Sequence, residues 1–264
     1  MLYPTALLVL TALSAAFVAG RSRAFSPVVA LLVFLLVTFS NKEVLETSPL
    51  RYAAVLVSLW GFYAWARNSL FWGTLLLSAA SLLYPPLVWL LPVLLLSLPF
   101  LEGEDRARKA VKSLGGWMLP YIYLFSYLIL FKGNAPERMA HILETAIEIK
   151  LPSFSFSIPD LALLLCLLLS FFHAGSTILM SFIERPDRRL LEIAYIQLFF
   201  AIAIYILFSA EGTAVALALF ALPLSLILSY HFKNCAGRRS ARAELVLTCI
   251  LSLIAIAEKF TGLF

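Results

Sequence analysis

The sequence predicts an all-α protein: a polytopic transmembrane helical bundle of about ten helices, with both termini extracytoplasmic. Of the 264 residues, 62% are hydrophobic and 13% are charged, and the mean hydropathy is +0.95. A water-facing surface needs far more charge than this. The apolar segments approach the roughly 20 residues that a helix needs to cross a bilayer. We therefore expect a single integral membrane domain over residues 1–264.

Five apolar segments are predicted in the first hundred residues: Pro4–Gly20, Pro27–Ser40, Leu50–Ala66, Ser69–Leu83 and Leu87–Leu101. Residues 1–20 carry no charge, and Arg21 and Arg23 follow directly, which indicates a retained first helix that enters from outside. Arg67-Asn68 is interpreted as a cytoplasmic turn. The two segments around Tyr84-Pro85-Pro86 are short, so this pair either spans or re-enters. Either form returns the chain to the side that it left.

Five further segments follow: Leu114–Phe131, Pro159–Ile183, Leu190–Ser209, Thr213–Phe232 and Ala243–Phe260. Basic residues divide unequally between the two sets of connections, fourteen against six of the twenty. Cytoplasmic loops retain Lys and Arg. The richer set is therefore assigned to the cytoplasm; it holds Arg21, Arg23, Arg67, Arg106, Arg108, Lys109, Lys112, Arg185, Arg188, Arg189, Lys233, Arg238, Arg239 and Arg242.

Residues 132–158 form the longest extracytoplasmic loop and are predicted to contain an interfacial amphipathic helix, capped by Asn134 and ended before Pro152. One face is apolar, with Met139, Ile142, Leu143, Ala146 and Ile147; the other is polar, with Glu137, His141, Glu144 and Glu148. Glu137, His141 and Glu144 have a spacing that can suit Zn²⁺. The stripe lacks a characteristic motif, so no metal site is predicted. The following segment, 151–159, is expected to be extended, as packing material or as a lid.

His173 is the one ionisable residue near the middle of a predicted span. It either bonds a neighbouring polar group within the bundle or handles substrate or protons. Glu192 and Gln197 are candidates for the same crevice, although Glu192 is better explained as a helix-end charge near Arg188. Together with Arg138 and His141 in the loop, these three residues are the candidate substrate-binding residues.

Several classes of function lack their sequence signals. No glycine-rich phosphate loop, HExxH or GxSxG occurs, and no acidic residue lies in the middle of a predicted span. Cys166, Cys235 and Cys249 form no CxxC pair. His231 lies beside Lys233 and is expected to be far in depth from His173. No catalytic residue, metal, cofactor or nucleic-acid partner is predicted.

One stretch resembles a known group of proteins. Residues 66–86 (ARNSLFWGTLLLSAASLLYPP) are followed, past a charged loop, by residues 115–121 (GGWMLPY), and an Asn41-Lys42 turn precedes them. This pattern resembles uncharacterised polytopic inner-membrane proteins of Bacteroidota-type Gram-negative bacteria, over about residues 35–130. The motifs consist of packing and turn residues, so the resemblance implies a compartment and a type of host and no activity.

The sequence favours a non-catalytic membrane subunit or scaffold of an envelope complex, in the bacterial inner membrane, with membrane lipids and other inner-membrane proteins as its partners. The alternatives are an envelope-biogenesis factor that handles a lipid-linked glycan, as a polymerase or flippase does, and a small-solute transporter. Whether the chain is an enzyme stays open, and a non-enzymatic role is favoured. The scarcity of polar residues within the spans supports the first of these functions.

Overall fold

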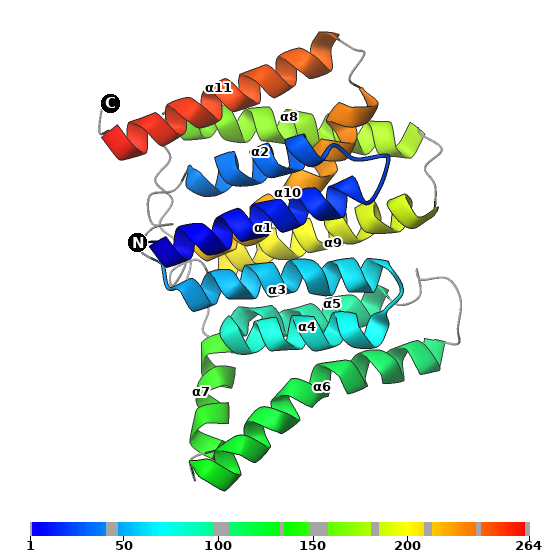
Figure 1. Ribbon diagram of the computed structural model, residues 1–264, viewed down its shortest axis with the longest axis vertical. Coiled ribbons are helices and arrows are strands. Elements are labelled where there is room, and N and C mark those ends of the chain that lie inside the picture. The colour runs from blue at the N-terminus through cyan, green and yellow to red at the C-terminus, as the bar shows by residue number, and fades with distance from the viewer. Residues whose placement is uncertain are drawn as a thin grey trace. The chain divides into compact units, whose positions relative to one another are not determined.

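The computed structural model describes residues 2–40, 47–97, 106–132, 135–147, 158–180, 185–208, 213–235 and 239–261. All regular structure in these ranges is helical, which confirms the all-α class (Figure 1). Each predicted apolar segment coincides with helical structure. The helices are α1 (Leu2–Gly20), α2 (Pro27–Phe39), α3 (Pro49–Ala66), α4 (Leu70–Leu83), the 3-10 helix η2 (Pro85–Trp89), α5 (Leu90–Ser97), α6 (Arg106–Phe131), α7 (Ala135–Ile147), α8 (Ile158–Met180), α9 (Arg185–Phe208), α10 (Thr213–Asn234) and α11 (Arg239–Thr261).

Four helices within the described ranges are long and apolar enough to cross a membrane: α1, α6, α10 and α11. Helices α2 and α4 are also apolar but have only 13 and 14 residues. At 1.5 Å per residue each is about 20 Å long, less than the ~30 Å hydrocarbon core. The described helices therefore make this a protein with several candidate membrane spans.

Helices α6, α9 and α11 begin four to eight residues before the predicted apolar segments, at Arg106, Arg185 and Arg239. The expected loop residues are therefore helical turns. Unbranched Arg, Lys and Glu side chains are good helix formers, so a helix continues past the point at which its apolar run ends. Apolar length marks the membrane-compatible part of a helix and underestimates the helix itself.

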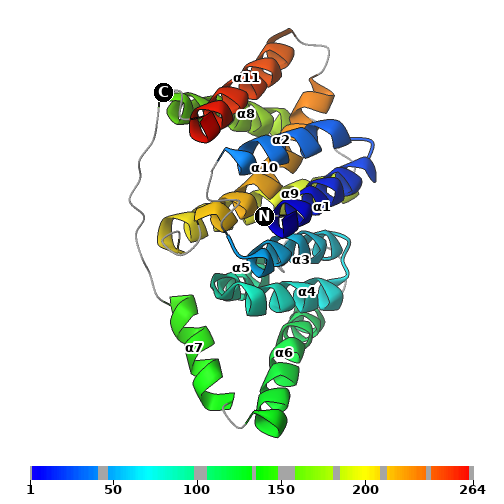
Figure 2. The ribbon, with the colours of Figure 1, turned by 60° about the vertical axis from the view of Figure 1, so that its left-hand side comes forward.

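The described chain forms two compact units, Met1–Tyr52 with Leu151–Phe264, and Ala53–Lys150. In the first unit α10 is central and contacts α1, α2, α8, α9 and α11 (Figures 1 and 2). In its most apolar stretch, of membrane-spanning length, 89% of the residues are buried, against 22% in the corresponding stretch of α11. A helix that is apolar on all sides is expected to be buried. Helix α11 is peripheral and packs mainly on α8.

The ends of the first unit differ in charge. The amide of Asn234, at the end of α10, donates to the Ala24 carbonyl in the α1–α2 turn (3.1 Å), and the Ser26 N–H donates to Ser229 (3.3 Å). The first turn of α11 and the start of α9 lie at this same end, and the first turn of α1 and the last turn of α11 lie at the other (Figure 1). One end thus collects the basic residues Arg21, Arg23, Arg188, Arg189, Lys233, Arg239 and Arg242.

In the second unit, α4 is held by two glycine contacts and two hydroxyl contacts. A Cβ on Gly73 would lie 2.9 Å from the backbone nitrogen of Trp65 on α3. Toward α6, the Ser78 hydroxyl donates to the Trp117 carbonyl, and Ser81 bonds the Tyr121 hydroxyl at 2.7 Å. Gly116 packs directly against α4. Small residues allow such close backbone approach in membrane helices.

The chain between α4 and α6 returns to the end at which α4 began, as the sequence predicts. Residues later in α4 contact residues later in α6, so the two helices are parallel. Helix α4 stops at Tyr84, which is extended (φ −139°, ψ 94°) because Pro85 follows and disfavours helical geometry before it. With 8 residues, α5 is about 12 Å long and too short to cross a bilayer alone. At the other end Asn68 adopts φ 64° and forms the predicted α3–α4 turn.

Candidate functional site

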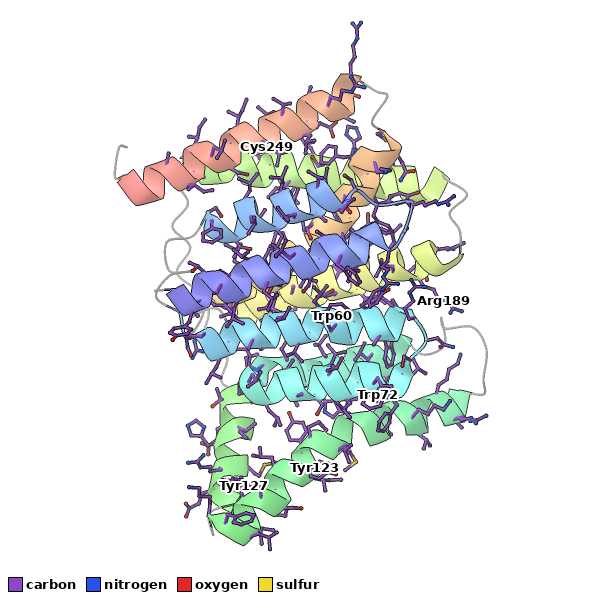
Figure 3. The ribbon with its side chains drawn as sticks, in the orientation of Figure 1. Trp60, Trp72, Tyr123, Tyr127, Arg189 and Cys249 are labelled. Carbon is purple, nitrogen blue, oxygen red and sulfur yellow. The ribbon has the colours of Figure 1, made fainter. Side chains whose placement is uncertain are left out.

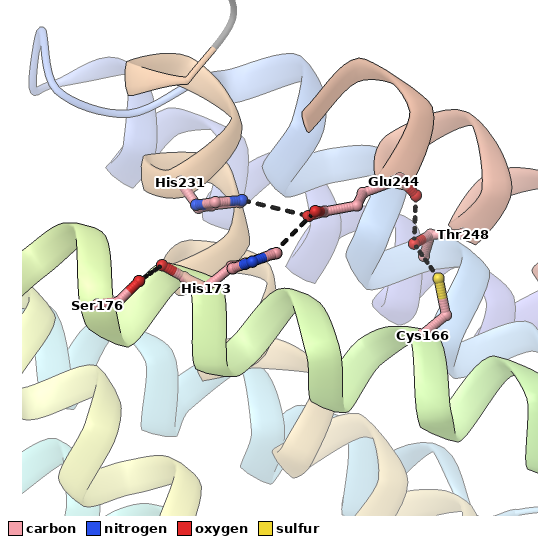
Figure 4. A network of polar contacts seen from close by, with 6 residues as sticks. All are labelled: Cys166, His173, Ser176, His231, Glu244 and Thr248. Atoms are coloured by element: carbon pink, nitrogen blue, oxygen red, sulfur yellow. Dashed lines mark hydrogen bonds and ion pairs between the residues drawn. The ribbon is translucent and has the colours of Figure 1, made fainter. Parts of the chain in front are cut away.

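Three helices of the first unit bring ionisable side chains together (Figure 4). His173 on α8 contacts Glu244 on α11, with 2.8 Å between Nδ1 and Oε1. His231 on α10 lies 3.4 Å from the other carboxylate oxygen, Oε2, through Nε2; this is an electrostatic contact and not a hydrogen bond. One carboxylate therefore lies between two imidazoles from different helices.

The three side chains differ in exposure. The exposed fraction is 61% for His173, 21% for Glu244 and 5% for His231. The two imidazole rings stack, with centroids 6.2 Å apart and planes inclined by 15°. The expectation that His231 lies far from His173 is therefore wrong. That expectation placed His173 in the middle of its span and His231 near the end of its own, whereas α8 passes the end of α10 at the level of His173, its sixteenth residue counted from Ile158.

A second contact keeps α8 and α11 in register. The Cys166 sulfur lies 3.3 Å from the Thr248 hydroxyl oxygen, and both side chains are buried. The Thr248 hydroxyl also donates to the Glu244 carbonyl, one turn earlier on the same helix (2.8 Å). Since His173 pairs with Glu244 and Cys166 with Thr248, the two helices are antiparallel. The His173–Glu244 and Cys166–Thr248 contacts together place the first turns of α11 beside the two histidines.

The cluster can exchange protons. A neutral imidazole has one N–H to donate, and a carboxylate has two oxygens that accept. With both imidazoles neutral the cluster carries a charge of −1; one added proton makes it neutral, and a second makes it positive. No group of three or more metal-ligating side chains suited to a metal ion occurs within the described ranges.

The other two candidates in this unit lie on α9. Glu192 is exposed and pairs with Arg188 at 2.9 Å, an i, i+4 contact that agrees with its interpretation as a helix-end charge. Gln197 is only 3% exposed, and its amide nitrogen has no hydrogen-bond partner among the residues that the structure describes. Among the described residues, neither Glu192 nor Gln197 forms a hydrogen bond or an ion pair with His173. Their roles as ligands stay predictions.

The candidates in the second unit lie on α7, which begins at Ala135 as an amphipathic helix (Figure 1). Arg138 and His141 are exposed, and the Thr145 hydroxyl donates to the His141 carbonyl at 2.8 Å. Met139 on the other side is half-buried, and α7 contacts η2. The predicted cap Asn134 and residues 151–157 of the segment predicted to be extended (151–159) lie outside the described residues; Ile158 and Pro159, its last two residues, are helical and begin α8. Within the described residues, Arg138 and His141 therefore lie on an exposed face of α7.

Sequence reasoning found His173 but missed Glu244 and His231 as its partners. A signal was present for one pair. His231 and Glu244 stand at nearly equal distances from the centre of the α10–α11 connection, 235–238, and a helical hairpin places such residues at one level. The contact with His173 has no such local signal, because α8 is separated from α10 by a whole helix.

These features define an all-helical protein with several candidate membrane spans and a titratable cluster at the basic end of one unit. The chain belongs to a family of unknown function, DUF6427, whose model matches residues 63–261. No curated protein and no solved structure matches the chain. The family match spans both units and includes His173, His231 and Glu244.

Proposed function

We propose that the chain is a multi-pass protein of the bacterial inner membrane, with about ten membrane-embedded helices, both termini outside the cytoplasm, and a host of the Bacteroidota type. The helix starts support this orientation. Helices α6, α9 and α11 each begin with a basic residue, although cations at a helix N-terminus are opposed by the helix dipole by about 0.3–1 kcal/mol. Retention of cytoplasmic Arg and Lys explains a placement that helix stability does not.

Its role is that of a non-catalytic subunit or scaffold of an envelope complex. The surface of α6 carries this proposal. In the most apolar stretch of α6, of membrane-spanning length, only 17% of the residues are buried. Met118, Tyr123 and Tyr127 are each at least half exposed (Figure 3). Aromatic residues and Met are enriched at protein interfaces. A second membrane protein that packs along α6 would cover this surface.

The test is gentle purification of the full chain from its host, followed by identification of bound proteins and lipids. A partner at fixed stoichiometry is expected, and the double substitution Tyr123→Leu with Tyr127→Leu should release it while the chain still inserts. The matched control is Leu13→Ala with Phe17→Leu on the exposed face of α1, which should retain the partner. A chain that purifies without any fixed protein partner would overturn the scaffold role.

The second candidate function is that of an envelope-biogenesis factor that handles a lipid-linked glycan, and the exposed polar face of α7 favours it. Arg138 and His141 both lie on this face, and guanidinium and imidazole groups bind phosphate. Arg138→Ala and His141→Ala should then each abolish envelope function without loss of insertion. A scaffold would tolerate both substitutions. Co-purification of a polyprenyl-linked glycan from the wild type, and its loss from both variants, would decide for this function.

A further inference from the structure

Helix α11 is held to its unit at two places that differ in chemistry. Along most of its length it lies on α8, and Ala241, Thr248, Ser252 and Ala255 form its buried side. Near its first turns, Glu244 reaches both His173 and His231. The first attachment consists of small and apolar groups, whereas the second depends on the charge of three ionisable groups.

Few other titratable groups face this cluster. Helix α2, which packs on both α10 and α11, has no ionisable residue between Pro27 and Phe39. Helix α8 offers Cys166, which contacts Thr248. The other charged groups that the structure describes at this end are at least partly exposed: Lys233 on α10, Arg239 and Arg242 on α11, Arg21 and Arg23 in the α1–α2 turn, and on α9 Arg189 and the Arg188–Glu192 pair. Glu244 is thus the carboxylate that contacts both histidines, and most of the other described charged side chains at this end are Lys or Arg.

Proton uptake changes the strength of the second attachment. Imidazole is the side-chain group that ordinarily takes up a proton between pH 5 and 8. With neutral imidazoles, a half-buried carboxylate is held by dipoles alone; with one imidazolium, the same contacts join opposite charges. Hydrogen bonds between charged partners are about twice as strong as neutral ones.

We propose that His173, Glu244 and His231 form a proton-binding site whose occupancy clamps the first turns of α11 onto α8 and α10. Loss of the proton weakens the clamp and releases this end of α11, while the contacts around Thr248 hold the rest of the helix. The proposal concerns a proton site within one unit and does not depend on the envelope role.

The experiment is hydrogen–deuterium exchange of the full-length protein in mild detergent at pH 6 and pH 8, with each rate divided by the intrinsic exchange rate at that pH. Three proteins are compared with the wild type. Glu244→Gln removes the charge that the proton neutralises. In the double variant His173→Asn with His231→Gln, the Asn side chain places an amide N–H near the position of His173 Nδ1, which bonds Glu244, and the Gln at position 231 keeps a neutral polar group beside the carboxylate; neither side chain can take up a proton. Glu258→Gln is the matched control, since it makes the same change near the other end of α11.

In the wild type, protection of residues 239–249 should be about two- to fivefold greater at pH 6 than at pH 8, the range for an ion pair at a partly exposed site. Glu258→Gln should keep this ratio. Glu244→Gln and the double histidine variant should both show equal protection at the two pH values. The double variant should stay folded because Asn keeps the hydrogen bond to Glu244 at position 173 and Gln fills a similar volume at position 231. A wild-type ratio near one, or an undiminished ratio in the double histidine variant, would overturn the proposal.

Discussion

Polar groups join helices in both units, but they do so in different ways. Between α4 and α6 the contacts come from hydroxyls and a glycine: Ser78 donates to a carbonyl, Ser81 bonds Tyr121, and Gly116 lies against the Phe71 carbonyl. Between α8, α10 and α11 they come from two imidazoles and a carboxylate. The first set keeps one charge state at every physiological pH, whereas the second does not.

We call the α4–α6 interface a fixed joint, because its strength does not depend on protonation, and the His173–Glu244–His231 contacts an adjustable joint, because their strength can. A glycine contact with a backbone carbonyl leaves no room for relative movement of the two helices, since packed interiors deform little. A pair of imidazoles around one carboxylate can hold its helices strongly or weakly with the same geometry. Substitutions in each interface measure how much the two differ in their contribution to the free energy of unfolding. The substitution with the largest expected effect comes first.

The largest effect is expected at Gly116. A Cβ there would lie 2.3 Å from the Phe71 carbonyl oxygen and 2.4 Å from the Thr74 hydroxyl oxygen, so backbone must move. Gly116→Val should lower the free energy of unfolding by about 3 kcal/mol or more, at the upper end of overpacking costs. The free energy is measured by SDS titration of the protein in mild detergent.

The neighbouring Gly115 supplies the control for this change. A Cβ at Gly115 meets no atom within 4 Å, and the residue lies inside α6. Gly115→Ala should therefore stabilise the protein by about 0.5–1 kcal/mol, since alanine loses less backbone entropy in a helix. Equal effects of the two substitutions would show that the α4–α6 joint is not closely packed.

The second effect is expected at Glu244. Glu244→Ala removes the common partner of two histidines, one of them only 5% exposed, and should cost about 1–3 kcal/mol near neutral pH. Glu258→Ala, near the other end of the same helix and away from both histidines, should cost less than Glu244→Ala. The same titration measures both. A Glu244→Ala variant as stable as wild type would make the cluster incidental to helix packing.

The third effect is smaller and concerns the fixed joint. Tyr121→Phe deletes only the hydroxyl that bonds Ser81, and single hydrogen bonds between membrane helices average about 0.6 kcal/mol. Tyr123→Phe makes the same change at a side chain that is 69% exposed and should have no measurable effect. If Tyr121→Phe matches the wild type, the hydrogen bond between Ser81 and Tyr121 does not contribute to the stability of the α4–α6 interface.

The two joints also differ in how well the sequence predicts them. The α4–α6 interface is marked by residue type, because Thr74, Ser78 and Ser81 recur at helical spacing in an apolar segment and meet the part of α6 that contains Gly115 and Gly116. The ten apolar segments were predicted for a similar reason: long apolar runs leave few alternatives to helices. Helix starts were not, because arginine belongs equally to a loop and to a first turn.

The histidine cluster could be predicted only in part. His173 is unusual in its own segment, so its sequence context marks it. Its partners are 58 and 71 positions further along the chain, and which residues meet it depends on how α8 crosses α10 and α11. Such crossings are set by side-chain packing along whole helices, which a single sequence does not display. Glu244 also lies one residue inside the predicted boundary of its segment, where a charge is ordinary.

The smallest effect sets a baseline for both joints. Arg188 and Glu192 form an i, i+4 ion pair on the exposed side of α9, with 69% and 46% of their side chains exposed. Such pairs contribute about 0.3–0.5 kcal/mol and are screened by salt. Glu192→Gln should lower the free energy of unfolding by this amount at low ionic strength and by less in 0.5 M salt. The Glu244→Ala effect should keep more of its size in salt, because Glu244 and His231 are largely buried, with 21% and 5% of their side chains exposed. If salt reduces both effects equally, the cluster behaves as a surface ion pair, and the distinction between an adjustable joint and an ordinary exposed contact is lost.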